Sequence, residues 1–221
     1  LMIGAILGMV STGDLFNFFV FLEISSLASA GLVAYKVAKG RAVEAGLKYL
    51  LVSTLGGIFF LFALGILYGQ YNALNMAMLA DMIQWTPLDK LALVLVVAAL
   101  AAKCGAVPMH FWTPDAYSMA PSAVTAMLVV ASQASLYGLF RICFTLYGIT
   151  LNYATIGWVI IILGILSMII GVTMAIPQKD IKRLMAYHAV SQTGYMLLGV
   201  GVGLAVLGDQ ALLNSYGMTA M

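Results

Sequence analysis

Long runs of apolar residues, separated by short polar connections, follow one another along the whole sequence. A membrane-spanning helix needs about 20 predominantly apolar residues, because the hydrocarbon core of a bilayer is roughly 30 Å thick. Six runs are long enough, and partial spans lie at residues 1–12 and 209–221. The six predicted spans cover residues 14–35, 48–69, 89–107, 121–147, 154–177 and 184–206. The pattern therefore predicts an all-α polytopic membrane protein.

The composition agrees with this fold class. Hydrophobic residues make up 63% of the chain and charged residues 8%, with a mean hydropathy of +1.06, whereas soluble domains are about 45–50% apolar and about 25% charged. Most of the 22 glycines fall inside apolar runs, where small residues let helices pack closely. No linker interrupts the chain, so residues 1–221 are expected to form a single transmembrane domain, cut through helices at both ends.

Basic residues cluster in two connections. Seven of the ten lysines and arginines lie near residues 36–48 or 179–183, and short cytoplasmic loops carry an excess of both residue types. An even number of spans separates the two connections, which places both on one side, assigned as cytoplasmic. Lys90 and four acids are expected in or near the opposite loops; the acids are Asp14, Asp81, Asp89 and Asp209.

Several functional classes are unsupported by the sequence. Cys104 and Cys143 stand alone in apolar runs, without the spacing that holds zinc, haem or an iron–sulfur cluster. We therefore expect neither a cofactor nor a metal site, and no redox catalysis by this chain alone. The net charge is only +2, and no basic stripe is interleaved with aromatic residues, so nucleic acid is not an expected partner.

Two charges stand deep inside predicted spans, Glu23 and Lys103. Each costs about 2.5–3.5 kcal/mol at a helix centre on insertion scales, so both are candidates for function. We expect them to pair, because an opposite charge favours the ionised form that burial disfavours. A pair that breaks and re-forms would switch proton affinity. The alternative is a static ion pair that fixes helix orientation.

A proline-rich segment follows Lys103. Three prolines fall within residues 108–121, and Pro108 is expected to interrupt the helix just beyond Lys103. Backbone groups freed by such a break must be buried in protein or hydrated, which favours water near Lys103. His110 comes next and titrates near neutral pH when unperturbed. It is a candidate proton relay, or else a hydrogen-bonded histidine in a connection.

A second histidine, His188, begins a polar stripe in the last full span. Ser191, Gln192 and Tyr195 share its helix face by their spacing. The stripe could line a hydrated path or could make hydrogen bonds between helices. Arg141, near the outer end of its span, is expected to snorkel or to pair with an acid of an outer loop.

Three segments resemble one protein family. They are GDLFNFFVFLEISSLASAGLVAY, KCGAVPMHFWTPDAYSMAPSAVTAML and DIKRLMAYHAVSQTGYMLLG. Each is similar to the antiporter-like proton-translocating membrane subunits of respiratory complex I and its relatives. The first looks closest to the large subunits of multisubunit sodium/proton antiporters and of membrane-bound hydrogenases. The three blocks together extend over nearly the whole chain.

The resemblance implies a fold of fourteen helices in two inverted five-helix repeats, with the seventh and twelfth helices broken. The six full spans would then be family helices five to ten. Glu23 would be the fifth-helix glutamate and Lys103 the seventh-helix lysine of the family's proton path. Gln133 falls where a lysine or histidine relay usually stands. The chain ends before the family's twelfth-helix lysine or glutamate, so this segment alone is not expected to translocate ions.

The sequence therefore predicts a proton-translocating subunit, with possible exchange of Na⁺, in a complex I-related respiratory or hydrogenase complex or in a multisubunit antiporter. Its proton path would use Glu23, Lys103, His110 and His188 together with water. Its expected partners are other membrane subunits, redox subunits and lipid, and its expected location is the inner or plasma membrane. The alternative is a non-conducting membrane scaffold subunit.

Overall fold

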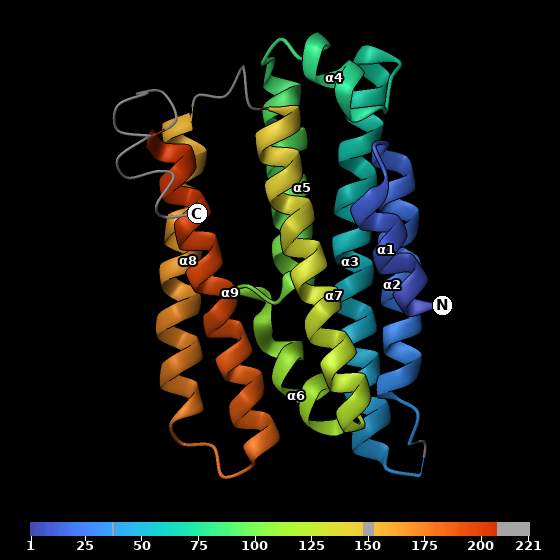
Figure 1. The fold of residues 1–221 in the computed structure, drawn as a ribbon, viewed down its shortest axis with the longest axis vertical. Coiled ribbons are helices and arrows are strands. Elements are labelled where there is room, and N and C mark those ends of the chain that lie inside the picture. Colours follow the sequence, from blue (N-terminus) through green and yellow to red (C-terminus); the bar gives the residue numbers. More distant parts are fainter. Residues whose placement is uncertain (37, 148–152, 207–221) are drawn as a thin grey trace. The chain divides into compact units, whose positions relative to one another are not determined.

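The computed structural model describes residues 1–36, 38–147 and 153–206, nearly all of them helical (Figure 1). The partial span predicted at 209–221, with Asp209, lies outside the described residues. The chain forms two compact units, one comprising Leu1–Cys104 and Asp115–Leu151, the other Gly105–Pro114 and Asn152–Met221. The single transmembrane domain expected from the sequence stays a prediction.

Four long helices of the first unit surround a common centre. Helix α2 packs on α3, α3 on α5, α5 on α7, and α7 again on α2, while α1 lies against α2 and α7 (Figure 1). A π-helical segment, η2, continues α7. The bounds are α1 Met2–Ser11, α2 Leu15–Val33, α3 Gly40–Tyr71, α4 Met76–Met82, α5 Pro87–Cys104, α7 Ser122–Arg141 and η2 Ile142–Leu146.

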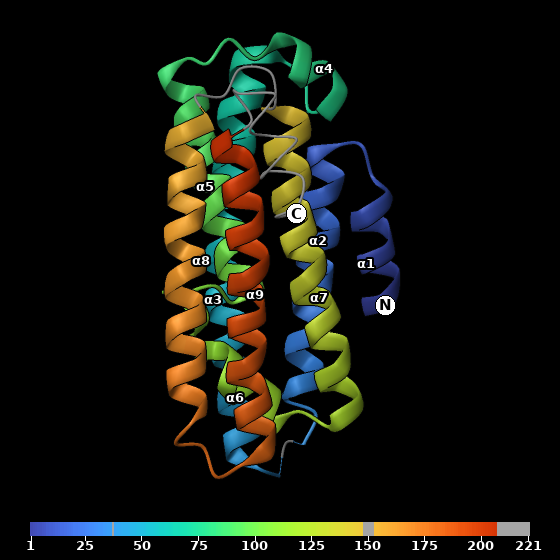
Figure 2. The same ribbon diagram turned by 60° about the vertical axis from the view of Figure 1, so that its left-hand side comes forward.

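The second unit is built on two helices that lie side by side in both views, α8 (Tyr153–Ala175) and α9 (Ile181–Val206) (Figure 2). Three glycines seven residues apart on α8 face the backbone of α9. A Cβ added at Gly164 would lie 2.8 Å from the backbone nitrogen of Leu198, and one at Gly157 or Gly171 would meet α9 as closely. The predicted role of these glycines in packing is confirmed here.

Helix ends follow local capping chemistry. The Asp14 side chain accepts hydrogen bonds from the backbone of Phe16 and Asn17, which starts α2, and Asn75 caps α4 in the same way. Helix α3 ends at Asn72, whose φ of 50° is in the left-handed region that terminates many helices. These caps explain why α2 and α4 begin, and α3 ends, directly beside a polar residue.

The observed helices reproduce the predicted spans with few changes. Five described helices are long and apolar enough to cross a membrane. Helix α9 coincides with the sixth predicted span and is not among these five. Helix α3 begins eight residues earlier than the predicted start at residue 48, and the connection expected at residues 69–88 contains the short helix α4.

Candidate functional site

The two buried charges of the first unit meet at its centre. The Lys103 Nζ of α5 lies 2.5 Å from the Glu23 Oε1 of α2. The Lys103 side chain is 3% exposed and that of Glu23 25% exposed, so the lysine is the more deeply buried partner. The predicted pairing of these residues is confirmed, and it spans two helices that lie on opposite sides of the four-helix ring. Their role in proton transfer stays a prediction.

The ammonium of Lys103 has a second partner. It donates to the Ser26 Oγ at 2.8 Å, while the Ser26 hydroxyl donates to the Leu22 carbonyl one turn earlier on α2. An ammonium carries three donors, and Glu23 and Ser26 account for two of them. The third donor is therefore available to a water molecule or a further acceptor.

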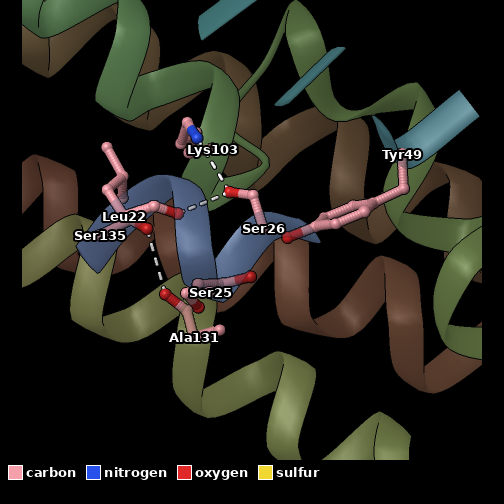
Figure 3. Close-up of a pocket in the computed structure, with 8 residues that line it drawn as sticks. Leu22, Ser25, Ser26, Tyr49, Lys103, Ala131 and Ser135 are labelled. Atoms are coloured by element: carbon pink, nitrogen blue, oxygen red, sulfur yellow. Dashed lines mark hydrogen bonds between the residues drawn. The ribbon is translucent and has the colours of Figure 1, made fainter. Parts of the chain in front are cut away.

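A small polar cavity adjoins Lys103 (Figure 3). Its volume open to the centre of a water molecule is about 10 Å³, and a buried water needs roughly 10–15 Å³ measured in this way. Hydroxyl groups converge on the cavity from three helices of the ring. It is lined by Leu22, Ser25, Ser26, Tyr49, Lys103, Ala131, Ser132 and Ser135. The cavity has the size and the polar lining for one water molecule.

A hydrogen bond links the cavity to the end of the unit where α6 (Trp112–Met119) lies. The hydroxyl groups of Ser132 and Tyr117 share a hydrogen bond of 2.7 Å, and both side chains are buried. Two residues before Tyr117, Asp115 accepts a hydrogen bond of 3.1 Å from Lys48 of α3. Ser132, which lines the cavity beside Lys103, is thus bonded to a tyrosine on the helix that also carries the partly exposed Asp115.

The helix carrying Lys103 ends at the next residue, Cys104, as predicted for the break near Pro108. Gly105 follows with φ of +77°, and a Cβ there would lie 2.6 Å from the Thr113 Oγ1. The backbone N–H of Val107 donates to the Ser167 Oγ of α8 at 2.9 Å, a contact inside the second unit. One backbone group freed by the break is thus bonded by protein, as an interrupted membrane helix requires.

The other sequence candidates occupy different places. His110 is half-buried in the 3₁₀ turn η1 (Met109–Phe111) of the second unit, and His188 is exposed on α9. Their relay roles stay predictions. Gln133 is half-buried on α7, and the α7 residues that line the cavity beside Lys103 are its neighbours Ser132 and Ser135, with Ala131. Hydroxyl groups, not Gln133, therefore face the lysine.

The predicted polar stripe of α9 is divided between two environments. Ser191 is buried against Gly171 of α8. Gln192 lies 3.4 Å from His188, and Tyr195 is exposed. Because Ser191 packs against α8, it does not share a hydrated helix face with His188 and Tyr195.

Arg141 and Asp89 lie at the other end of the first unit. Arg141 donates to the backbone carbonyl of Val10 at 3.0 Å, rather than pairing with an acid. Asp89 lies in the first turn of α5, next to the loop as predicted, and is fully buried. Its Oδ2 accepts hydrogen bonds from the Tyr71 hydroxyl at 2.7 Å and from the Thr86 backbone and hydroxyl. Within the described residues, no three His, Cys, Asp or Glu side chains gather closely enough to hold a metal ion.

Ser26 and Ser132 were not among the residues predicted to form the site. Ser26 lies three residues after Glu23, on the same helix face. This spacing could have identified it as a second partner for whatever Glu23 binds.

Comparisons with known proteins confirm the family resemblance found in the sequence. Residues 12–220 match the family described as "NADH:quinone oxidoreductase/Mrp antiporter, TM". The chain is 42% identical to NADH-quinone oxidoreductase subunit N of Desulforudis audaxviator over 216 residues, which are 95% of this chain and 42% of that protein. It is 38% identical to the subunit of the same name from Herminiimonas arsenicoxydans, with 95% and 43% covered. The chain thus spans less than half the length of these relatives.

Solved structures show the same fold. A chain of an archaeal membrane-bound sulfane sulfur reductase superposes with a TM-score of 0.84 at 30% identity, over 96% of this chain and 45% of that one. A chain of the Mrp complex from Dietzia sp. DQ12-45-1b gives 0.82 at 30% identity, over 100% and 42%. A chain of respiratory complex I from Thermus thermophilus gives 0.73 at 28% identity, over 98% and 47%.

Proposed function

Because the chain belongs to the NADH:quinone oxidoreductase/Mrp antiporter transmembrane family, we propose that it forms the proton-conducting core of an antiporter-like membrane subunit. Lys103 is the proton-loading group, and Glu23 is the partner whose approach or withdrawal controls when the proton leaves. The subunit lies in an energy-transducing inner or plasma membrane and moves H⁺ while partner subunits, or an opposing ion gradient, supply the driving force.

The observation that carries the proposal is the position of the pair next to a hydroxyl-lined cavity. A lysine held only for structural reasons would be enclosed by its acceptors. Here two donors of Lys103 are held by Glu23 and Ser26, and the same lysine lines the cavity. A water in this cavity would accept the third proton of the ammonium and pass a proton on to the hydroxyl of Ser132.

Release of that proton requires Glu23 to move. While the carboxylate is 2.5 Å from the ammonium, it stabilises the charged lysine. When it withdraws, the lysine remains in a site that is 3% exposed, where burial favours the neutral form. A displacement of one carboxylate therefore converts a proton-holding site into a proton-releasing site.

The parent assembly follows from the relatives and belongs to the proposal. Proteins with this family's fold occur in respiratory complex I, in a sulfane sulfur reductase and in an Mrp complex. We place this chain in an assembly of that kind, together with other membrane subunits. Exchange of Na⁺ for H⁺ is a second activity that the transport measurement tests. The proposed proton path still comprises Glu23, Lys103, His110 and His188, with Gln133 at the usual position of the central relay. To these residues we add the hydroxyl groups of Ser132 and Tyr117.

The test is proton movement by proteoliposomes that contain the full parent complex, followed with a pH-sensitive dye in the presence and absence of Na⁺. The variant Lys103→Ala should abolish proton movement while the complex still assembles. If the proton movement lost in the variant does not require Na⁺ in the native complex, the complex is a redox-driven proton pump. If the lost proton movement requires Na⁺, the complex is an antiporter. Transport equal to native in this variant would rule out the proposed role.

The competing hypothesis, a scaffold subunit whose ion pair only fixes the helices, makes a different prediction for the exchanged pair Glu23→Lys with Lys103→Glu. A static pair should tolerate the exchange, because the same two charges still meet. A directional proton path should fail, because the proton-loading group would then stand on α2 beside Ser26 and away from the Lys103 position at the end of α5.

A further inference from the structure

Helix α3 contributes no charged group to the Glu23–Lys103 pair, yet two of its glycines border it. We propose that Gly57 is a positioning residue for proton transfer, because the space left by its missing side chain is where the Glu23 carboxylate lies when it binds Lys103. This inference rests on the proposed function, since it assigns a role in the same site.

The space at Gly57 is narrow. A Cβ added at this position would lie 2.7 Å from the Glu23 Cδ and 3.2 Å from its Oε2, and still closer to Oε1. Carbon atoms without a bond between them are best separated by about 3.5–4.0 Å. A methyl group at Gly57 therefore cannot coexist with the Glu23 side chain in its present position. The overlapping atoms include the carboxylate oxygen that binds Lys103.

The preceding glycine, Gly56, fits α3 against α5. A Cβ there would lie 3.2 Å from the Ala99 carbonyl oxygen and 3.4 Å from the Lys103 Cγ. Neighbouring glycines of one helix thus adjoin the two partners of the pair, with Gly56 beside the lysine stem and Gly57 beside the carboxylate. Helix α3 forms a common wall against which the pair is held.

Aromatic packing keeps α3 from moving away from α2. Three residues beyond Gly57, the buried Phe60 stacks on Phe18 of α2 with ring centroids 5.6 Å apart, and on Phe19 at 6.3 Å. These contacts lie about one turn from Glu23 on α2 and fix the separation of the two helices. An added methyl at Gly57 would therefore displace the end of the flexible Glu23 side chain rather than the helices.

Gly57, where an added Cβ would overlap the Glu23 side chain, differs from another glycine of the same helix. A Cβ at Gly65 would have no heavy atom within 4 Å, so Gly65 has no packing requirement for glycine. Glycine in a helix interior is less stable than alanine. At Gly57 that loss is offset by the carboxylate that occupies the vacant space.

The first experiment compares Gly57→Ala with Gly65→Ala in the full complex reconstituted in proteoliposomes. We expect Gly57→Ala to lower the rate of proton movement about tenfold and to shift the midpoint of its pH profile by about one unit, since one unit of proton affinity corresponds to a factor of ten. Gly65→Ala should leave both quantities native. A native rate and pH profile in Gly57→Ala would overturn the proposal.

The second experiment asks whether the methyl acts through Glu23. Glu23→Asp removes one methylene and withdraws the carboxylate from Gly57. We expect this change to lower transport in the native background but to raise it in the Gly57→Ala background, a non-additivity typical of groups in contact. Equal effects in both backgrounds would overturn the proposal. If Gly57→Ala does not assemble, the same double variant is scored by recovery of assembly, and failure to recover counts against the proposal.

These outcomes are separate from those of the proposed function. Native transport by Lys103→Ala would remove the role of the pair itself. Loss of transport in Lys103→Ala, combined with additive effects at Gly57 and Glu23, would keep the role of the pair and remove only that of Gly57.

Discussion

The Lys103 ammonium donates to the Ser26 hydroxyl oxygen at 2.8 Å, while the proton of that hydroxyl is held by the Leu22 carbonyl. Ser26 therefore acts as an acceptor for the lysine, and it does so from the same helix as Glu23. This second acceptor would keep the Lys103 side chain beside the cavity when Glu23 withdraws, until the proton leaves.

Replacing Ser26 by alanine should slow proton transport about tenfold, because a hydrogen bond to a charged group contributes roughly 1.5–3 kcal/mol. The measurement is the initial rate of dye response in proteoliposomes. Ser26→Thr keeps the hydroxyl and should retain most of the rate. A native rate in Ser26→Ala would contradict this account.

The bond between Tyr117 and Ser132 gives a second prediction. Tyr117→Phe removes one of two buried hydroxyl groups that lie 2.7 Å apart and leaves the ring in place. If protons pass along these hydroxyl groups, transport should fall several-fold while the amount of assembled complex stays native. Thr125, whose hydroxyl donates to the Tyr117 backbone carbonyl, provides the control, since Thr125→Val removes a different hydrogen bond to the same residue and leaves the Tyr117 hydroxyl in place.

The buried carboxylate of Asp89 should matter for stability rather than for transport. It is fully buried and accepts hydrogen bonds from the Tyr71 hydroxyl and from two groups of Thr86. Asp89→Asn should destabilise the subunit by about 1–3 kcal/mol, because an amide nitrogen placed there meets donors and leaves buried groups unsatisfied. Thermal unfolding of the purified complex measures this loss, and the exposed Asp81→Asn should leave it unchanged.

The close approach of α8 and α9 should make Gly164 intolerant of any side chain. Its added Cβ would lie 2.8 Å from a backbone nitrogen of α9, and a backbone cannot move aside as a flexible side chain can. Gly164→Ala should therefore destabilise the helix pair by about 1–3 kcal/mol. The same substitution at Gly65 should be neutral or slightly stabilising, which a melting experiment on both variants would show.

Much of this architecture was predictable from the sequence because its cause is local. Runs of about 20 apolar residues fix the spans through the thickness of the bilayer. The pairing of Glu23 with Lys103 was predictable because a buried charge needs a partner, and few other charges lie deep in the spans. The helix end at Cys104 was predictable from the nearby proline.

The site residues that the sequence did not predict depend on how the helices face one another. Ser132 and Gly57 are small residues in apolar helices, and nothing in their own segments distinguishes them from packing positions. Their importance arises from the register of α3 and α7 against α2, which a single sequence does not specify. Helix α4 was a different kind of omission, because Asn75 directly before Met76 is a recognisable helix cap.

The loops before α2 and α4 are joined backbone to backbone. Leu15 donates to the Leu74 carbonyl at 2.9 Å, and Met76 donates to the Gly13 carbonyl at 2.9 Å. The start of α2 is thus tied to the far end of α3, about 12 Å along the axis from Glu23 at 1.5 Å per residue. A piston-like stroke of α2 would break this tie, so withdrawal of the carboxylate has to come from rotation of the Glu23 side chain or local bending of its helix.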